Sequence, residues 1–203
     1  IVDAVTSLGG IELKVDDWGI DAIYSGSQKC LSCVPGISPV SFSDRAVSLI
    51  QNRKTKVQSW FLDMNLIVGY WGSGAKRAYH HTAPVNSMYA MYESLLMLRE
   101  EGLENAWQRH QRGHEALAQG LEALNLTLAV DKNYRLPQLN VVEIPSGVND
   151  ADVRQRLLNE FNLEIGAGLG EFAGKVWRIG LMGYACKPRN IDHCLAALKQ
   201  VLK

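Results

Sequence analysis

The sequence has no excess of charge of either sign. Its 21 lysines and arginines equal its 21 aspartates and glutamates, so the formal net charge at pH 7 is zero. A balanced chain without long basic runs gives no support for a nucleic-acid partner or for a membrane surface. It also lacks an apolar run long enough to cross a bilayer and a basic-then-apolar signal pattern at its start. We expect an intracellular protein, cytoplasmic in a bacterium, with the peroxisome or the mitochondrion as further options in a eukaryote.

Cysteine is scarce. The four cysteines in 203 residues do not indicate a disulfide scaffold. Cys30 and Cys33 have the C-x-x-C spacing, but zinc would require a second pair, so we interpret them as ordinary reduced thiols in a reducing compartment. The chain is 47% hydrophobic, which is enough to bury a globular core.

The most informative stretch is residues 20–29, Ile-Asp-Ala-Ile-Tyr-Ser-Gly-Ser-Gln-Lys. A short run rich in β-formers gives way to small polar residues, which predicts a strand and then a tight loop that ends at Lys29. A lysine that forms a Schiff base must present a neutral amine, which burial or nearby cations favour. Most lysines are solvated surface residues, so Lys29 indicates a function only together with partners.

Asp3 is the first such partner. It follows the β-branched residues Ile1 and Val2, so we expect it at the C-terminal end of a strand, where open α/β sheets bind their ligands. A carboxylate there can hold a pyridine nitrogen protonated. Pyridoxal phosphate (PLP) needs such a partner if its ring is to accept electrons.

With Asp3 and Lys29 together, the chain resembles the fold-type I PLP-dependent aminotransferases. More narrowly, Ser25-Gly26-Ser27-Gln28-Lys29 followed by Pro35-Gly36 looks like the alanine–glyoxylate and serine–pyruvate aminotransferase family, which belongs to the class V aminotransferases. Further matches follow in the family's order: Tyr79-His80-His81-Thr82-Ala83-Pro84-Val85, Glu101-Gly102-Leu103-Glu104-Asn105 and Arg178-Ile179-Gly180-Leu181. Several motifs in order along the whole chain make this resemblance specific.

The resemblance implies an α/β fold in two domains. Residues 1–102 would be the C-terminal part of the large PLP-binding domain, a mostly parallel sheet with helices, and residues 103–203 a small C-terminal α+β domain. The sequence has no initiator methionine, and Ile1-Val2 looks like a strand already under way. We therefore expect that about the first half of a family member is absent, and that the chain is a fragment or part of a longer protein.

The residue patterns predict the following elements. We expect strands at 40–42, 126–130, 139–144 and 176–182, and loops at 72–74 and 166–170. We expect six helices. The first begins at Ser43, the second lies within 59–70, and the third runs from a Thr82 cap to Gly102. The others span 104–123, run from an Asn149 cap to Phe161, and span 190–202.

Arg178 is the most informative residue of the C-terminal part. It lies in the otherwise apolar run 176–182, where an unpaired guanidinium would be costly to bury. Its planar fork suits a carboxylate held by two hydrogen bonds. An internal ion pair with an Asp or Glu fits the residues equally well, and the family resemblance favours the carboxylate of the substrate.

The resemblance implies roles for the other candidates. Lys29 would bind PLP covalently and move the substrate's α-proton, while Asp3 would contact the ring nitrogen. The Gln28 amide, the Tyr79 phenol and the Thr82 hydroxyl would contact the cofactor phosphate. In the family, the residues that match Tyr79 and Thr82 reach the cofactor of the opposite subunit, which implies a homodimer with shared active sites.

His80 and His81 raise the question of a metal. Adjacent side chains on an extended segment point to opposite faces, so the pair would be a poor chelate. We therefore expect no metal site, and packing or interface roles for these two histidines.

The activity that the resemblance implies is transfer of an amino group from a small amino acid, alanine or serine, to a keto acid, glyoxylate or pyruvate. Three alternatives remain: another aminotransferase specificity, a PLP-dependent cysteine desulfurase, and an inactive fragment that acts only in assembly. A desulfurase would need a mobile nucleophilic cysteine, and none of the four is placed for it. The sequence does not indicate the preferred donor and acceptor.

Overall fold

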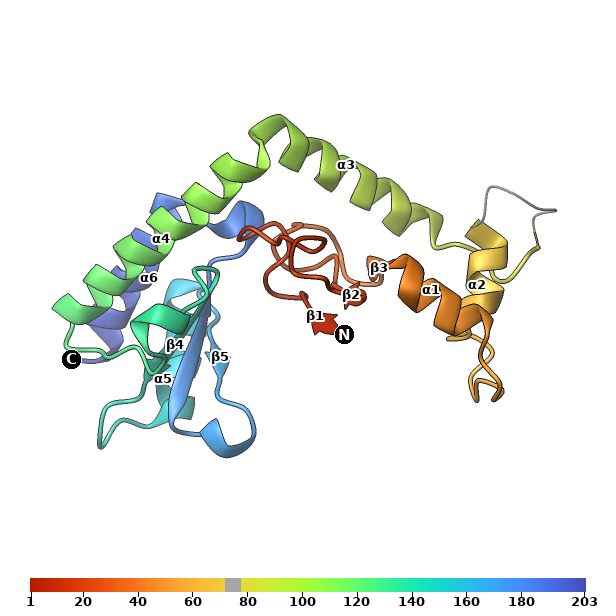
Figure 1. The fold of residues 1–203 in the computed structure, drawn as a ribbon. Helices are drawn as coiled ribbons and strands as arrows, with labels where there is room; N and C mark the ends of the chain where they lie inside the picture. Colours follow the sequence, from red (N-terminus) through yellow and green to blue (C-terminus); the bar gives the residue numbers. More distant parts are fainter. Residues whose placement is uncertain (72–77) are drawn as a thin grey trace.

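A computed structural model gives the fold, and it describes residues 1–71 and 78–203. The described residues form two three-stranded sheets together with helices (Figure 1). The loop that we expect at residues 72–74 lies outside the described ranges. Among the helices of the described residues, none is both long enough and apolar enough to cross a membrane.

The first sheet contains β1 (Val2–Asp3), β2 (Ala22–Tyr24) and β3 (Val40–Phe42), in that order. The pair β1–β2 is parallel and the pair β2–β3 is antiparallel. The expectation of a mostly parallel sheet is therefore wrong for the described residues. The loop after β2 folds back on itself, with the Ser25 N–H bonded to the Pro39 carbonyl at 2.8 Å, so β3 returns antiparallel.

Two short helices follow this sheet. Helix α1 (Asp44–Gln51) begins after Ser43, whose Oγ accepts a hydrogen bond from the Ala46 N–H at 3.2 Å, so the predicted cap is confirmed. Helix α2 (Met64–Trp71) confirms the helix expected within 59–70, although it starts later. Neither helix contains a fully buried residue.

The two long helices meet at one glycine. Helix α3 (Val85–Glu101) ends at Gly102, as predicted, and α4 (Leu103–Ala123) begins directly after it. Gly102 has a φ of 85°, a conformation that suits glycine and few other residues. Gly102 thus joins α3 to α4, and the two helices meet at an angle (Figure 1).

The predicted start of α3 is wrong. Pro84 occupies the N-cap position and makes no side-chain cap hydrogen bond. The Thr82 hydroxyl is bonded instead to the Tyr79 hydroxyl, with 2.6 Å between the two oxygens. A tertiary partner has therefore replaced the local capping interaction.

Two glycines inside α4 do not interrupt the helix. A Cβ at Gly113 would lie 2.5 Å from Cys186 Sγ, and a Cβ at Gly120 would overlap the Leu195 side chain. Leu195 belongs to the last helix, α6 (Pro188–Val201), which begins with Pro188 two residues earlier than predicted. Gly113 therefore leaves room for Cys186, and Gly120 allows α4 and α6 to approach closely.

The second sheet has the order β4 (Leu139–Glu143), β6 (Val176–Gly180) and β5 (Gly166–Ala167), and both pairs are antiparallel. Helix α5 (Asp150–Phe161) follows β4, and Asn149 caps it as predicted. Residues 126–130 contribute only an isolated bridge between Leu128 and Val142 instead of the predicted strand. Residues 166 and 167 pair with β6, so the loop expected at 166–170 is wrong for these two. Short 3₁₀ helices lie at Lys132–Tyr134, Gly170–Phe172 and Gly183–Ala185.

The hydrophobic core lies between this second sheet and helices α4, α5 and α6. Its fully buried side chains include Leu117, Val142, Leu157, Trp177 and Leu198. Residues 1–102 contain far fewer buried apolar side chains. The C-terminal part therefore packs around its own core, whereas much apolar surface of the N-terminal part is exposed.

Candidate active site

The loop that carries Lys29 is fixed by its two serines. The Ser25 hydroxyl donates to the Ala4 carbonyl at 2.9 Å, and the Ser27 hydroxyl donates to the Val34 carbonyl at 2.6 Å. Both serines are buried and Lys29 is half-buried. The predicted strand-then-loop arrangement is confirmed, and the small polar residues hold the backbone on both sides of the turn.

Asp3 ends strand β1, as predicted, and stands opposite Tyr24 in the parallel register. Its carboxylate accepts hydrogen bonds from the Val5 N–H to Oδ1 and from the Tyr24 hydroxyl to Oδ2, each at 2.8 Å. The Val5 N–H first, and then the Tyr24 hydroxyl, lower the pKa of Asp3 below its ordinary value. Asp3 is therefore ionised at neutral pH, which a partner for a protonated ring nitrogen requires.

Gln28 and Lys29 line one cavity of about 520 Å³. Its other walls come from Ser32 and from the end of β6 and the residues after it, including Met182 and Tyr184. The two parts of the chain thus meet beside Lys29.

Arg178 lies on β6, opposite Gly166 of β5, and is half-buried. Its Nε donates to the Ala167 carbonyl at 2.7 Å, and none of the ion pairs among the described residues includes Arg178. The alternative of an internal ion pair thus finds no carboxylate in the described part of the chain. The terminal guanidinium nitrogens make no hydrogen bond to the described residues.

Tyr79 and Thr82 do not join this cavity. Both side chains are exposed, they bond to each other, and none of the cavity's lining residues comes from their segment. The Tyr79 ring instead contacts the ring of Tyr70 on α2, with 6.2 Å between the centroids. Within one chain, these two candidates are therefore separate from Lys29.

The two histidines do not point apart, so that expectation is wrong. The chain bends at His81, and the Nδ1 atoms of His80 and His81 lie 2.8 Å apart. The His80 ring is buried and stacks on Trp60 with 4.0 Å between centroids, which is a packing role. Across residues 1–71 and 78–203, no group of three or more His, Cys, Asp and Glu residues is arranged to hold a metal ion.

All four cysteines are free, as the sequence predicts. Burial raises the pKa of Cys30 and of Cys194 to about 11, and it also raises the pKa of Cys186. Cys33 is half-buried. The three buried thiols are protonated at neutral pH and are poor nucleophiles.

The sequence analysis missed a group of residues that contact the Lys29 loop from the C-terminal part. His110 of α4 is fully buried and accepts a hydrogen bond from the Gly183 N–H at 2.9 Å. Ser32, three residues after Lys29, accepts one from the Tyr184 N–H at 2.8 Å. No local sequence pattern marks these contacts, because 73 and 152 residues separate the partners.

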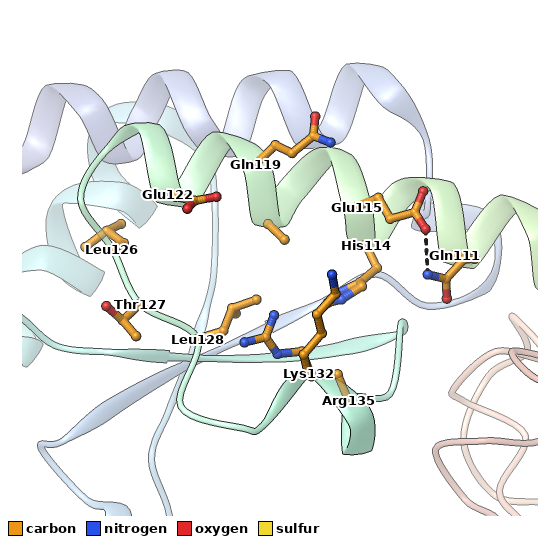
Figure 2. Close-up of a pocket in the computed structure, with 11 residues that line it drawn as sticks. Gln111, His114, Glu115, Gln119, Glu122, Leu126, Thr127, Leu128, Lys132 and Arg135 are labelled. Atoms are coloured by element: carbon orange, nitrogen blue, oxygen red, sulfur yellow. Dashed lines mark hydrogen bonds between the residues drawn. The ribbon is translucent and has the colours of Figure 1, made fainter.

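A larger cavity of about 700 Å³ lies elsewhere, between α4 and residues 126–135. Figure 2 shows side chains of α4 on one side, where Gln111 donates to Glu115 at 2.7 Å, and Lys132 and Arg135 across from them. None of the candidate catalytic residues lines it. Its size therefore does not make it the active site.

Comparison with known proteins identifies the fold. The chain superposes on the crystal structure of an alanine–glyoxylate aminotransferase from Nostoc with a TM-score of 0.96 at 54% identity, over all of this chain and 53% of that one. It superposes on a ureidoglycine–glyoxylate aminotransferase from Bacillus subtilis with a TM-score of 0.95 at 41% identity, over 99% of this chain and 51% of that one. The fold is therefore a mixed α/β part of a fold-type I aminotransferase.

The sequence comparison defines the family. The model of the aminotransferase class-V family matches residues 1–186. The alanine–glyoxylate aminotransferase of Rattus norvegicus is 44% identical over 205 residues, which cover all of this chain and 50% of the relative. The chain belongs to the class-V aminotransferase family, and it spans about half the length of the curated relatives that it matches.

Proposed function

We propose that the protein is a PLP-dependent aminotransferase that transfers the amino group of alanine or serine to glyoxylate or pyruvate. Its family supports this activity, because relatives at 44% and 54% identity are alanine–glyoxylate aminotransferases. The observation that carries the proposal is the pairing of β1 with β2. It brings ionised Asp3 to the strand ends from which the Lys29 loop departs.

The residues present fit the cofactor. Asp3 would hold the ring nitrogen of PLP, Lys29 would bind its aldehyde carbon, and the Gln28 amide would donate to its phosphate. When bound, PLP supplies an electron sink for the bonds at the substrate α-carbon. Lys29 is half-buried and Asp3 is exposed, so a ligand can reach both side chains.

The chain's own residues then perform three tasks. Lys29 Nζ takes the proton from the substrate α-carbon and returns a proton later, as a general base and acid. Asp3 stays anionic and favours the protonated ring nitrogen. Arg178 holds the substrate carboxylate with the guanidinium nitrogens that make no hydrogen bond among the described residues.

The proposal includes a homodimer whose active sites are shared. Tyr79 and Thr82 lie apart from the Lys29 cavity, so they would serve the phosphate site of a second copy. Helix α3 buries only Met91 and Ser94 in this chain, while Tyr89 and Tyr92 are 73% and 63% exposed. Such exposed aromatic surface is typical of an interface. We also propose residue 102 as the boundary between the large and the small domain.

A different amino donor is the second candidate. The (S)-ureidoglycine–glyoxylate transaminase of Bacillus subtilis is 38% identical over 220 residues, so ureidoglycine is a donor to test beside alanine and serine. Burial raises the pKa of Cys30 and Cys194 to about 11, which disfavours these two thiols as the nucleophile of a desulfurase.

The experiment is borohydride reduction of the protein with PLP, followed by peptide mapping. The expected result is a cofactor label on Lys29, with alanine–glyoxylate transamination before reduction. Lys29→Ala should keep the fold and lose activity by about 100-fold or more, as expected when a general acid–base group is removed. Lys14→Ala removes an exposed lysine and is the matched control. A label on another lysine would contradict the assignment, and absence of both label and activity would indicate a module that acts only in assembly.

A further inference from the structure

We propose that His110 and Ser32 are positioning residues for Lys29, which act through the corner formed by Gly183 and Tyr184. They hold the C-terminal part of the chain against the Lys29 loop and thereby set where Lys29 Nζ stands. The expected effect on kcat rests on the proposed function. The ordering of the Lys29 loop rests on hydrogen bonds alone.

The turn after Lys29 is conformationally unusual. The Ser32 N–H donates to the Lys29 carbonyl at 3.0 Å and closes the turn. Ser32 has a φ of 60°, a left-handed conformation that is unfavourable for a residue with a side chain. Such a turn persists when its surroundings hold it. The Tyr184 N–H does so, because it donates to Ser32 Oγ at 2.8 Å.

Gly183 lets the corner approach the loop closely. Gly183 is buried, with a φ of 55°. A Cβ there would overlap Ser32 Oγ and would lie 2.8 Å from the Cys30 carbonyl oxygen. The corner therefore packs backbone against backbone on the residues that follow Lys29, with no side chain between them.

Two consecutive residues of α4 hold Gly183 by both of its polar backbone groups. His110 Nε2 accepts from the Gly183 N–H at 2.9 Å, and Arg109 Nη1 donates to the Gly183 carbonyl at 2.6 Å. Arg109 is itself fixed by a two-pronged bond to Glu101, at 2.5 and 2.8 Å. The corner is thus anchored to α4.

The hydrogen bonds also define the state of His110. Because the Gly183 N–H is a donor, Nε2 must be the unprotonated nitrogen. His110 Nδ1 then carries the proton and donates to the Ala106 carbonyl at 2.6 Å. A neutral His110 is therefore a specific acceptor for Gly183, and a side chain of similar size without an acceptor leaves that N–H unpaired.

The relay runs from His110 to Gly183, along the backbone to Tyr184, and from there through Ser32 to Lys29. None of these contacts involves a group that would react. Misplacement of a reacting group by about 1 Å can cost on the order of 100-fold in rate. Loss of the relay should therefore lower kcat more than it raises KM.

The test uses two variants of the full-length protein. His110→Phe keeps the ring volume and removes the acceptor, whereas His110→Gln offers an amide oxygen near the position of Nε2. We expect kcat to fall by about 10- to 100-fold in His110→Phe and to recover largely in His110→Gln, with KM changed by less than about threefold. Ser32→Ala should lower kcat as well. In the double variant, the loss of kcat should be smaller than the two single losses combined, because Ser32 and His110 act through one relay.

A second readout needs neither cofactor nor activity. Amide hydrogen exchange of residues 29–33, measured without PLP, should accelerate by about tenfold or more in His110→Phe, since opening of the corner releases the Ser32 N–H. His114→Phe is the matched control, because His114 is a buried histidine one turn later on α4. It bonds to Asn140 at 2.6 Å and not to Gly183. That variant should lose thermal stability without changing exchange in 29–33.

The outcomes separate the two proposals. Unchanged exchange in 29–33 together with wild-type kcat in His110→Phe would overturn the relay while the proposed function stands. An equal loss of kcat in the Phe and Gln variants would show that the acceptor is not what matters, and would also overturn it. If the unmodified protein carries no PLP on Lys29 and does not transaminate, the proposed function fails, and the exchange measurement alone decides whether His110 orders the loop.

Discussion

The hydroxyl of Tyr24 donates a hydrogen bond of 2.8 Å to Asp3 Oδ2, across the parallel pair β1–β2. The contact lowers the pKa of Asp3, after the larger effect of the Val5 N–H, and the Asp3 carboxylate raises the pKa of Tyr24. A residue of β2 that lies five positions before Lys29 thus helps to keep the carboxylate on β1 ionised. Strand β2 thus contacts Asp3 through Tyr24 and leads directly into the loop that carries Lys29.

We first predict that Tyr24→Phe raises the pKa of Asp3. Asp3 is then protonated at a higher pH as the solution is acidified, so binding of PLP should be lost at a higher pH than in the unmodified protein. The pKa of Asp3 lies below its usual 3.8, so the measurement is the cofactor absorbance between about pH 2 and 5. Tyr134→Phe, which alters an exposed tyrosine far along the chain, should leave the profile in place. Coincident profiles for the Tyr24 variant and the unmodified protein would contradict the prediction.

The second prediction concerns Arg178→Lys. A lysine cannot reproduce a two-pronged contact with a carboxylate, so KM for both amino and keto acids should rise by about 10-fold or more. The melting temperature should change little, because the only hydrogen bond of Arg178 among the described residues goes to a neutral carbonyl. Arg154→Lys disturbs an ion pair with Asp150 instead and should keep KM unchanged. A lower melting temperature with normal KM in the Arg178 variant would indicate a structural role.

The third prediction tests whether the active sites are shared. A Lys29→Ala chain is mixed with a chain that carries Tyr79→Phe and Thr82→Ala. Each parent should be nearly inactive, whereas the mixture should regain about a quarter of the wild-type activity, because half of the re-formed dimers are mixed and each has one intact site. Native mass spectrometry verifies that mixed dimers form. Mixed dimers without activity would show that Tyr79 and Thr82 act within their own chain.

The fourth prediction is a pH dependence of stability. Burial lowers the pKa of His110 below its usual 6.5. The hydrogen bond with the Ala106 carbonyl opposes this shift, Arg109 adds to it, and Glu101 opposes it. Between these two pKa values the unfolded chain binds a proton that the folded chain does not, so the free energy of unfolding falls as the pH drops below about 6.5. His110→Gln cannot be protonated and should show a smaller fall. Thermal melts of both proteins at pH 7.5 and 5.5 give the comparison, and equal falls would refute the assignment.

The sequence predicts the features that local chemistry decides. Ser43 and Asn149 cap their helices through bonds to residues two or three positions away, and Gly102 ends α3. Asp3 is a candidate because it lies directly after two β-formers, and Lys29 because it ends the short polar loop that follows strand β2. These signals lie within a few residues of the features that they predict.

The features that the sequence did not predict depend on distant partners. Thr82 fails to cap α3 because the Tyr79 hydroxyl binds it. Gly166 and Ala167 form a strand because β6 lies beside them, and the first sheet is not mostly parallel because β3 returns antiparallel. His110 has no local signature at all, since its partner Gly183 is 73 residues away.

Gly102 has a mechanical consequence. Helix α3 has 17 residues and is therefore about 25 Å long. Its C-terminal end is joined to α4 at Gly102, which has a φ of 85°. A rotation of about 10° at Gly102 moves the far end of the helix by about 4 Å, which exceeds the reach of one hydrogen bond. The segment with Tyr79 and Thr82 is attached to that far end. The backbone angles of a single glycine therefore set the distance over which these two side chains can reach another site.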